Sequence, residues 1–293
     1  MERLDPENRL FTELENGNPE WWQLLKDDRE IYIDIRKENK IDIYYNGGAI
    51  FRNLRHDGNT FLAETHYKYL LPEKANYINI SLNQMPIYQQ DSNVQLLDIE
   101  SLEEVLPRIK ANIGHHYSAS SEKGIQARFV LKSGGFIDSE FQCSFVYENV
   151  QKTARIDLTW IDINNQEIIM TELKTIGDPR LYDGDITLQL TKYMQFIELN
   201  GERLLDYYQR LFLIKQQLGL VPEPLRHLES LEGFIVQEKP LLLFGDCNKK
   251  WIANFADDIR DAVQNVAFGS YFSGKPEYNC DRIIRTNRNR HIY

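Results

Sequence analysis

The sequence predicts an α/β protein, in which a layered core fills the second half of the chain and a β-rich region precedes it. In the second half, helix-like and strand-like periodicities alternate, which is the pattern of a sheet flanked by helices. In the first half, short segments of alternating polarity follow one another between turn-forming residues, as in an antiparallel meander. We therefore expect two domains, residues 1–115 and residues 116–293.

The first half combines two helical regions with a run of strands. Residues 5–28 predict one or two short helices, with Trp21 and Trp22 on their apolar face. A second helix is expected at residues 98–112, where Pro107 should bend or end it. Between these helices, alternation of apolar and polar residues predicts four strands, at residues 31–35, 41–45, 49–54 and 60–69.

The second half predicts helices and strands in turn. The helices are expected at residues 120–132, 186–218 and 249–266, and Asn200-Gly201 would break the long one. The strands are expected at residues 140–147, 153–162, 167–175, 233–237 and 241–244. Helices and strands in this order indicate one mixed core.

Composition narrows the class of protein. Of the 293 residues, 42% are hydrophobic and 27% charged, which is typical of a soluble globular chain. No apolar stretch is long enough for a membrane span, and the charged N-terminus does not resemble a secretory signal. Cys143, Cys247 and Cys280 have no paired metal-ligand spacing, so we expect buried free thiols and a cytoplasmic location.

The formal net charge of -10 limits how the chain could bind nucleic acid. Phosphate backbones attract Lys and Arg, so an acidic chain has to gather its positive charge locally. The C-terminal stretch 281–293 is one place where this occurs, because it contains four arginines and a single acid. This stretch is either an arm that contacts phosphates or a solvated tail.

One predicted hairpin carries the chemistry. Asn164-Asn165 is favourable for a tight turn, because Asn tolerates positive φ. A hairpin centred there pairs residues whose numbers add up to 329, so that Asp157 lies opposite Glu172. The same register places Arg155 opposite Lys174.

Two opposed carboxylates on one sheet face repel each other unless a proton or a cation lies between them. Paired oxygen ligands of this kind suit Mg²⁺ or Mn²⁺, which bind one or two carboxylates together with water and phosphate oxygens. A neighbouring ammonium group such as that of Lys174 can orient a water or stabilise a charged transition state. The chemistry that this set favours is in-line attack on a phosphodiester.

The segment Arg155-Ile156-Asp157-Leu158, followed by Glu172-Leu173-Lys174, resembles the PD-(D/E)xK nuclease superfamily. Gln189 and Tyr193 share a helix face and resemble the Q-x-x-x-Y motif of its RecB-like branch. The resemblance covers roughly residues 118–200, with residue 245 as its outer limit, and says little about the first 115 residues.

The resemblance implies a fold and a set of roles. The fold would be restriction-endonuclease-like, a mixed sheet flanked by helices. Asp157, Glu172 and the carbonyl of Leu173 would be metal ligands, with Glu122 of the preceding helix as a further one. Lys174 would be catalytic, and Gln189 and Tyr193 would position the substrate or the lysine. The implied activity is a Mg²⁺- or Mn²⁺-dependent nuclease, with DNA favoured over RNA.

Each of these residues also has an ordinary structural explanation. The acids and bases of the hairpin could form a plain charged sheet face, and the helix dipole alone favours Glu122 in a first turn. Glu140 is a rival metal ligand on the adjacent strand, and His115-His116 reads as an ordinary loop pair. The four tyrosines of the first half suit base stacking or, more simply, sheet packing; they are Tyr44, Tyr45, Tyr67 and Tyr69.

Two other functions remain open at this level. One is a non-catalytic scaffold or nucleic-acid-binding subunit that retains the nuclease fold. The other is a small-molecule phosphoesterase that uses the same acids. The β-rich domain at residues 1–115 would select the substrate or a protein partner, and no membrane partner is expected.

Overall fold

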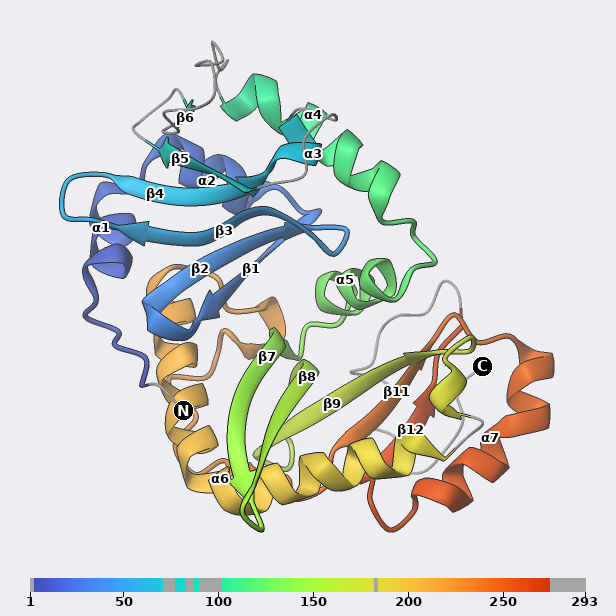
Figure 1. The fold of residues 1–293 in the computed structure, drawn as a ribbon. Helices are drawn as coiled ribbons and strands as arrows, with labels where there is room; N and C mark the ends of the chain where they lie inside the picture. The colour runs from blue at the N-terminus through green and yellow to red at the C-terminus, as the bar shows by residue number, and fades with distance from the viewer. Residues whose placement is uncertain (1–2, 71–76, 83–86, 90–101, 182–183, 275–293) are drawn as a thin grey trace. The chain divides into compact units, whose positions relative to one another are not determined.

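The computed structural model describes residues 3–70, 77–82, 87–89, 102–181 and 184–274. The chain is a mixed α/β protein with one antiparallel and one mixed sheet, each accompanied by helices (Figure 1). It divides into two compact units, residues 2–127 with 213–220, and residues 128–212 with 221–293. The expected domain boundary at residues 115 and 116 stays a prediction.

The N-terminal unit consists of an antiparallel meander with helices. Its strands pair in chain order, from β1 to β6. They are β1 (Ile31–Arg36), β2 (Lys40–Tyr45), β3 (Gly48–His56), β4 (Phe61–His66), β5 (Tyr77–Leu82) and β6 (Ile87–Gln89). The helices are α1 (Arg9–Gly17), α2 (Glu20–Asp27), α3 (Tyr67–Leu70) and α4 (Leu102–His116). The first residues of α5 (Glu122–Lys132) also belong to this unit.

This meander confirms the expectation from alternation, with three differences. Residues 67–69, expected in a strand, lie in α3. The strands β5 and β6 were not predicted. Pro107 does not end α4, which continues to His116 and buries Val105, Ile109 and Ile113. A buried apolar face of this kind outweighs the hydrogen bond that proline removes.

Two acids lie opposite each other in this sheet and are neutralised within the unit. Asp34 of β1 pairs with Asp42 of β2, and both are buried. Arg36 contacts both carboxylates, at 3.2 and 3.3 Å. Lys215 contacts Asp34 at 3.1 Å, and the Tyr44 hydroxyl donates to Asp42 at 2.9 Å. Two acids and two cations thus form one buried network on this face of the meander.

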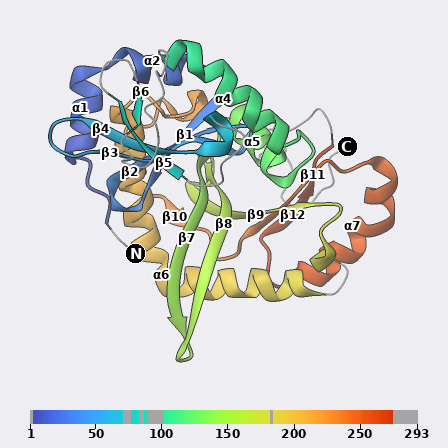
Figure 2. The same ribbon diagram turned by 45° about the horizontal axis from the view of Figure 1, so that its top comes forward.

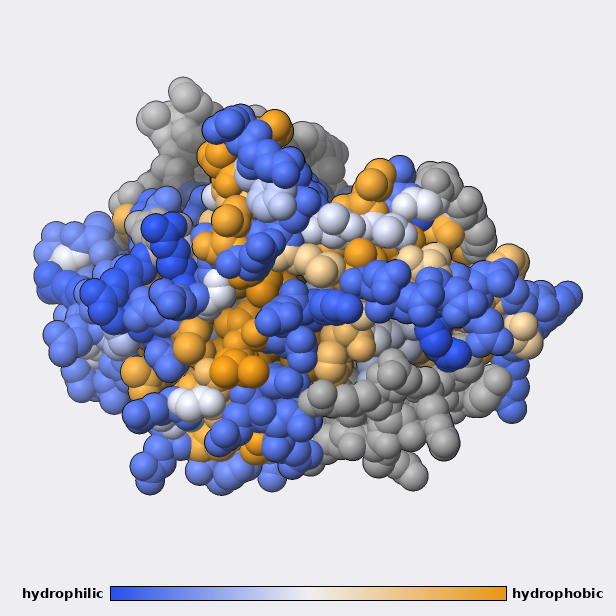
Figure 3. Space-filling view, turned by 90° about the horizontal axis from the view of Figure 1, so that it is seen from below, coloured by the Kyte–Doolittle hydropathy of each residue, from blue (hydrophilic) through white to orange (hydrophobic). Residues whose placement is uncertain are grey.

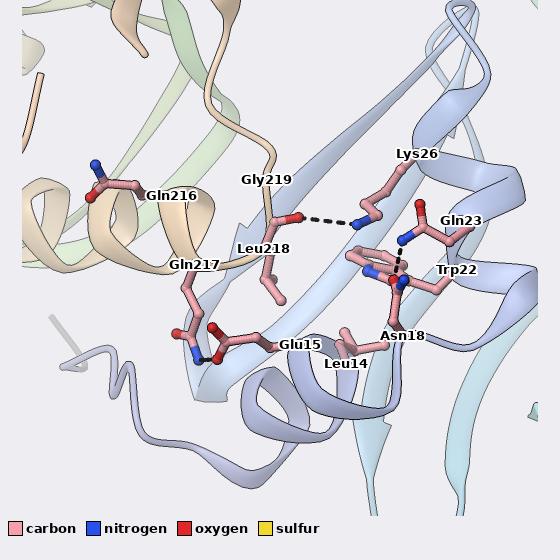
Figure 4. Close-up of a pocket in the computed structure, with 10 residues that line it drawn as sticks. All are labelled: Leu14, Glu15, Asn18, Trp22, Gln23, Lys26, Gln216, Gln217, Leu218 and Gly219. Atoms are coloured by element: carbon pink, nitrogen blue, oxygen red, sulfur yellow. Dashed lines mark hydrogen bonds between the residues drawn. The ribbon is translucent and has the colours of Figure 1, made fainter. Parts of the chain in front are cut away.

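A cavity of about 290 Å³ lies in the same unit, between α1, α2 and the residues that follow the last turn of α6 (Asp185–Gln217) (Figure 4). The Lys26 ammonium donates to the Leu218 carbonyl there, and burial lowers the pKa of Lys26. None of the residues expected to carry chemistry lines this cavity.

The C-terminal unit is built on a mixed sheet with the strand order β12-β11-β9-β8-β7. Its strands are β7 (Phe136–Tyr147), β8 (Val150–Asp162), β9 (Glu167–Thr175), β10 (Ile235–Val236), β11 (Leu241–Gly245) and β12 (Gly269–Phe272). The strands β7, β8 and β9 are antiparallel, whereas β11 runs parallel to β9 and β12 parallel to β11. Short β10 pairs with the start of β9, and β12 was not predicted.

Two helices cover this sheet. In Figures 1 and 2, α6 runs across β7, β8 and β9. Its contacts with the sheet are aromatic: Phe141 packs against Tyr207 and Phe145 against Phe196. The second helix, α7 (Lys249–Val263), buries Trp251 against β11 and β12.

The expected break at Asn200-Gly201 does not occur, because α6 is continuous from Asp185 to Gln217. Asn200 is buried, and its side-chain amide donates to the Phe196 carbonyl at 2.9 Å. The apolar face continues on both sides of it, through Ile197 and Leu204. Side-chain packing therefore overrides the weak helix propensity of these two residues.

The face in Figure 3 is mostly hydrophilic, with hydrophobic residues gathered near its centre. The exposed large apolar side chains include Val146 and Val150 beside the β7–β8 turn, and Leu188 and Leu199 on α6. Within the part of the chain described, no helix combines the length and the apolar character needed to cross a membrane.

The buried network of the N-terminal unit gives a stability prediction. Replacing Lys215→Met removes one of the cations that neutralise Asp34, so we expect the free energy of unfolding to fall by about 3–5 kcal/mol. Urea titrations followed by tryptophan fluorescence would measure this. The control is Arg260→Ala, which breaks an exposed pair with Asp257 and should change stability by less than about 0.5 kcal/mol. Equal effects of the two substitutions would contradict the assignment.

Candidate active site

The register of the β8–β9 hairpin agrees with the expectation from the sequence. The strands pair from Asp162 and Glu167 to Leu158 and Thr171, and the numbers of each pair add up to 329. The ladder ends there, so that the expected pairs Asp157–Glu172 and Arg155–Lys174 fall beyond it and stay predictions. Beyond it, the Asp157 carboxylate accepts a hydrogen bond from the Leu173 backbone N–H at 2.8 Å. Where the β8–β9 ladder ends, this hydrogen bond to the Asp157 side chain takes the place of the next main-chain hydrogen bond between the strands.

Glu172 is the most enclosed acid of this site, with 1% of its surface exposed. It forms an ion pair with the equally buried Lys174. The Gln189 side-chain amide donates to its Oε1 at 2.6 Å, and the Tyr193 hydroxyl donates to its Oε2 at 2.7 Å. Both oxygens of this buried carboxylate are therefore satisfied, as burial of a charge requires.

The helix α6 places Gln189 and Tyr193 together, because residues four apart share a helix face. The Gln189 Nε2 atom lies 3.2 Å from the Tyr193 hydroxyl oxygen. The hydroxyl has a single proton, which it shares between Glu172 Oε2 and the backbone carbonyl of Arg155 on β8. One tyrosine therefore connects the helix to the strand that carries Asp157 and to the acid on β9. The spacing in the sequence predicted the shared face, and only the fold shows that both side chains reach Glu172.

Two further residues complete the network and were not identified from the sequence. Asp178 is buried just after β9, and its Oδ2 lies 3.6 Å from the Lys174 ammonium. Arg180, in the single turn Pro179–Leu181, contacts both Asp178 oxygens, at 2.9 and 2.6 Å. Arg180 also donates to Gln189 Oε1 at 3.3 Å. The sequence shows that Lys174 and Asp178 are four residues apart, but it does not show the turn that brings their side chains together.

Glu140 lies in β7 with a φ of 56° and interrupts the ladder with β8. The paired residues on either side are Ser139 with Leu158 and Phe141 with Ile156, so that Glu140 falls opposite Asp157. A positive φ at a residue other than glycine is strained, and such strain often accompanies functional sites. Glu140, the rival ligand, is thus near Asp157. Glu122 belongs to the N-terminal unit, and its metal-binding role stays a prediction.

The electrostatics of the site disfavour two free carboxylates. Burial raises the pKa of Asp157 well above its usual range, and the charge of Glu172 raises it further. The hydrogen bond from Leu173 and the charge of Lys174 lower the pKa of Asp157, but by less than the first two effects raise it. Burial and Glu172 likewise raise the pKa of Tyr193, so its hydroxyl stays protonated and can donate. A divalent cation between the acids would relieve this repulsion.

The donor set fits a hard divalent cation. Asp157 and Glu172 supply two carboxylates, and the Leu173 carbonyl lies on the same strand, 3.4 Å from the Lys174 ammonium. One or two carboxylates with water and substrate oxygens are the usual ligands of Mg²⁺. Within the described residues, no group of three or more His, Cys, Asp or Glu side chains is arranged to hold a metal, so Asp157 and Glu172 would need other oxygen donors.

Positive charge gathers beside these acids. Burial lowers the pKa of Lys192, and the charges of Arg155, Lys152 and Arg180 lower it further, although Glu172 opposes them. Lys152 donates to Gln195 of α6 at 2.8 Å. Among the residues that the structure describes, Lys152, Arg155 and Lys192 form no ion pair. We call Lys152, Arg155, Arg180 and Lys192 the basic group.

The remaining expectations have simple outcomes. His115 and His116 lie in the last turn of α4 and not in a loop. Tyr44 stacks on Tyr32 at 5.1 Å in the sheet, which agrees with the packing explanation. Cys247 is buried with its pKa raised to about 12 by burial, whereas Cys143 is partly exposed. The arginines of residues 281–293 and Cys280 lie outside the described residues.

The raised pKa of Asp157 predicts a pH-dependent stability. The folded protein holds this proton more tightly than the unfolded chain, so the stabilisation is complete below about pH 4 and is lost as the pH rises. Replacing Asp157→Asn removes the titration. We expect its melting temperature without metal to exceed that of the wild type at pH 8, by about 2–4 °C per kcal/mol recovered. At pH 4 the two should be similar. Asp257→Asn, on exposed α7, is the control, and an Asp157→Asn effect that does not vary with pH would contradict the assignment.

Comparisons with known proteins add no relative to this picture. No protein-family model, no curated protein and no solved structure matches the chain. The grouping of Asp157, Glu172, Lys174, Gln189 and Tyr193 therefore rests on the contacts described above.

Proposed function

We propose that the protein is a Mg²⁺- or Mn²⁺-dependent nuclease of the PD-(D/E)xK type that hydrolyses phosphodiester bonds in DNA. One observation carries the proposal. Asp157 and Glu172 lie where the β8–β9 ladder ends, near enough for the charge of Glu172 to raise the pKa of Asp157, and Glu172 contacts a buried lysine two residues further along its strand. The Q-x-x-x-Y pair of α6 reaches the same carboxylate from the helix.

Each residue has a role that its contacts support. Asp157, Glu172 and the Leu173 carbonyl would hold the metal ion, which when bound supplies Lewis-acid activation of water and phosphate. Lys174 carries a compact positive charge on a flexible stem, which suits it to orient a water or stabilise charge on a phosphate oxygen. Gln189 and Tyr193 donate to Glu172 and keep its carboxylate in one orientation.

The basic group supports a polyanionic substrate. Lys and Arg residues number 34 in this chain against 44 Asp and Glu, so a group of cations near one another is a local departure from its overall negative charge. Lys192 is near enough to Glu172, Arg155 and Lys152 for each of their charges to shift its pKa. Phosphates flanking the scissile bond would provide their counterions. A small phosphoester would need fewer such contacts, which favours a polymer.

The fold supports the same proposal at a coarser level. The antiparallel strands β7, β8 and β9 continue into parallel β11, with α6 packed on the sheet. This arrangement is compatible with a restriction-endonuclease-like core. The first half, an antiparallel meander, would select the substrate or a protein partner.

A non-catalytic scaffold remains the alternative, and one observation favours it. The Lys174 ammonium and two neutral donors already satisfy Glu172 without a metal. A scaffold would keep this network closed. Calorimetric titration with Mn²⁺ distinguishes the two functions, because a nuclease should release or absorb heat on binding and a scaffold should not.

The nuclease activity has a direct test. The wild-type protein is incubated with linear, circular and single-stranded DNA and with RNA, with and without Mn²⁺, and the products are separated on gels. We expect cleavage of DNA that depends on Mn²⁺. Asp157→Asn, Glu172→Gln and Lys174→Ala should each lower the rate by at least about 10²-fold, while Asp257→Asn should not change it. Undiminished cleavage by the first two variants would refute the site.

The basic group predicts a salt dependence of binding. DNA affinity is measured by fluorescence anisotropy at several salt concentrations, with Ca²⁺ in place of Mn²⁺. Arg155→Ala and Lys192→Ala should each weaken binding and reduce the slope of log K against log salt by about 1. Lys250→Ala, an exposed residue of α7, is the matched control. Slopes that are equal for all variants would place the DNA elsewhere.

A further inference from the structure

Five side chains at the site form a closed ring of polar contacts. Glu172 pairs with Lys174, and Lys174 Nζ lies 3.6 Å from Asp178. Asp178 binds Arg180, Arg180 donates to Gln189, and Gln189 donates back to Glu172. The Lys174 ammonium thus lies between two carboxylates, in contact with Glu172 and close to Asp178.

A divalent cation bound to Glu172 would compete with this ammonium group for the charge of the carboxylate. Both oxygens of Glu172 are already engaged, and of their three donors only Lys174 is positively charged. The ammonium is therefore the donor that a dication repels, and it has to move. A lysine head on a four-carbon stem can do so at low cost if another acceptor is near. Asp178 is that acceptor, because it is buried and a shift of under about 1 Å brings the ion pair to hydrogen-bond distance.

We propose that Asp178 is a positioning residue that takes over the ammonium group of Lys174 when a divalent cation binds Asp157 and Glu172. The inference rests on the proposed function, since it requires the metal site. Asp178 would not touch the metal or the substrate. It would keep Lys174 charged and beside the reacting phosphate, while Arg180 holds the Asp178 carboxylate in place from its other side.

The test is a double-mutant cycle read out as Mn²⁺ affinity, measured by calorimetry on the full chain without DNA. The proteins are the wild type, Asp178→Asn, Lys174→Met and the double variant. We expect Asp178→Asn to weaken Mn²⁺ binding about tenfold, as outer contacts of metal sites typically do. Lys174→Met should bind at least as tightly as the wild type. In the Lys174→Met background, Asp178→Asn should change the Mn²⁺ affinity less than about twofold, because the ammonium group that Asp178 would accept has been removed.

Three controls keep the outcomes distinct. Asp257→Asn removes the same charge from exposed α7 and should not change the affinity. Asp178→Glu retains a carboxylate and should recover most of the wild-type affinity. Melting temperatures identify variants that fail to fold. If Asp178→Asn is one of them, the Mn²⁺ affinity of Asp178→Glu tests the proposal instead.

Other results would overturn the proposal. An equal loss of affinity in both backgrounds would make Asp178 a metal ligand or a long-range charge. An unchanged affinity with a lowered melting temperature would make it a structural cap of its turn. A wild type that binds no Mn²⁺ would refute the proposed metal site itself, which is a different failure from an absent coupling between Lys174 and Asp178.

Discussion

The burial of the Glu172 carboxylate is the constraint on which the C-terminal unit depends. An ionised acid inside a protein is strongly unfavourable unless charged and hydrogen-bonding partners surround it. Glu172 lies on β9, which has neighbouring strands on both sides, so its partners have to come from outside its own sheet pairing. They are Lys174 on the same strand and Gln189 and Tyr193 on α6. This requirement fixes where along the sheet α6 lies.

The same chain contains a second pair of opposed acids, which shows what differs here. Asp34 and Asp42 also face each other across neighbouring strands, but Arg36 and Lys215 neutralise them. That network contains as many cations as acids and has no need of a further ion. At Asp157, by contrast, burial and Glu172 raise the pKa. This raised pKa, rather than the presence of two acids, is the reason why we propose a metal ion at the second site.

Part of the site follows from local rules that a sequence displays. The Asn164-Asn165 turn and the alternation of β8 and β9 determine the register, which was predicted correctly for the pairs from Asp162 and Glu167 to Leu158 and Thr171. Helical spacing determines that Gln189 and Tyr193 share a face. The contribution of Asp178 depends on a turn after β9, and the strain at Glu140 depends on how β7 adapts to β8. Neither leaves a periodic signal.

The sequence alone determined the elements whose cause is local: the meander of the first half, the β8–β9 hairpin with its register, and the helical face of α6. These follow from side-chain period and turn chemistry, which act over a few residues. Tertiary structure decided what depends on packing between distant segments. It kept α6 continuous through Asn200 and α4 through Pro107, because buried apolar faces outweigh weak local propensity. It also brought Lys192 of α6 near Lys152 and Arg155 of β8, since charges far apart in a sequence come together only when strand and helix pack together.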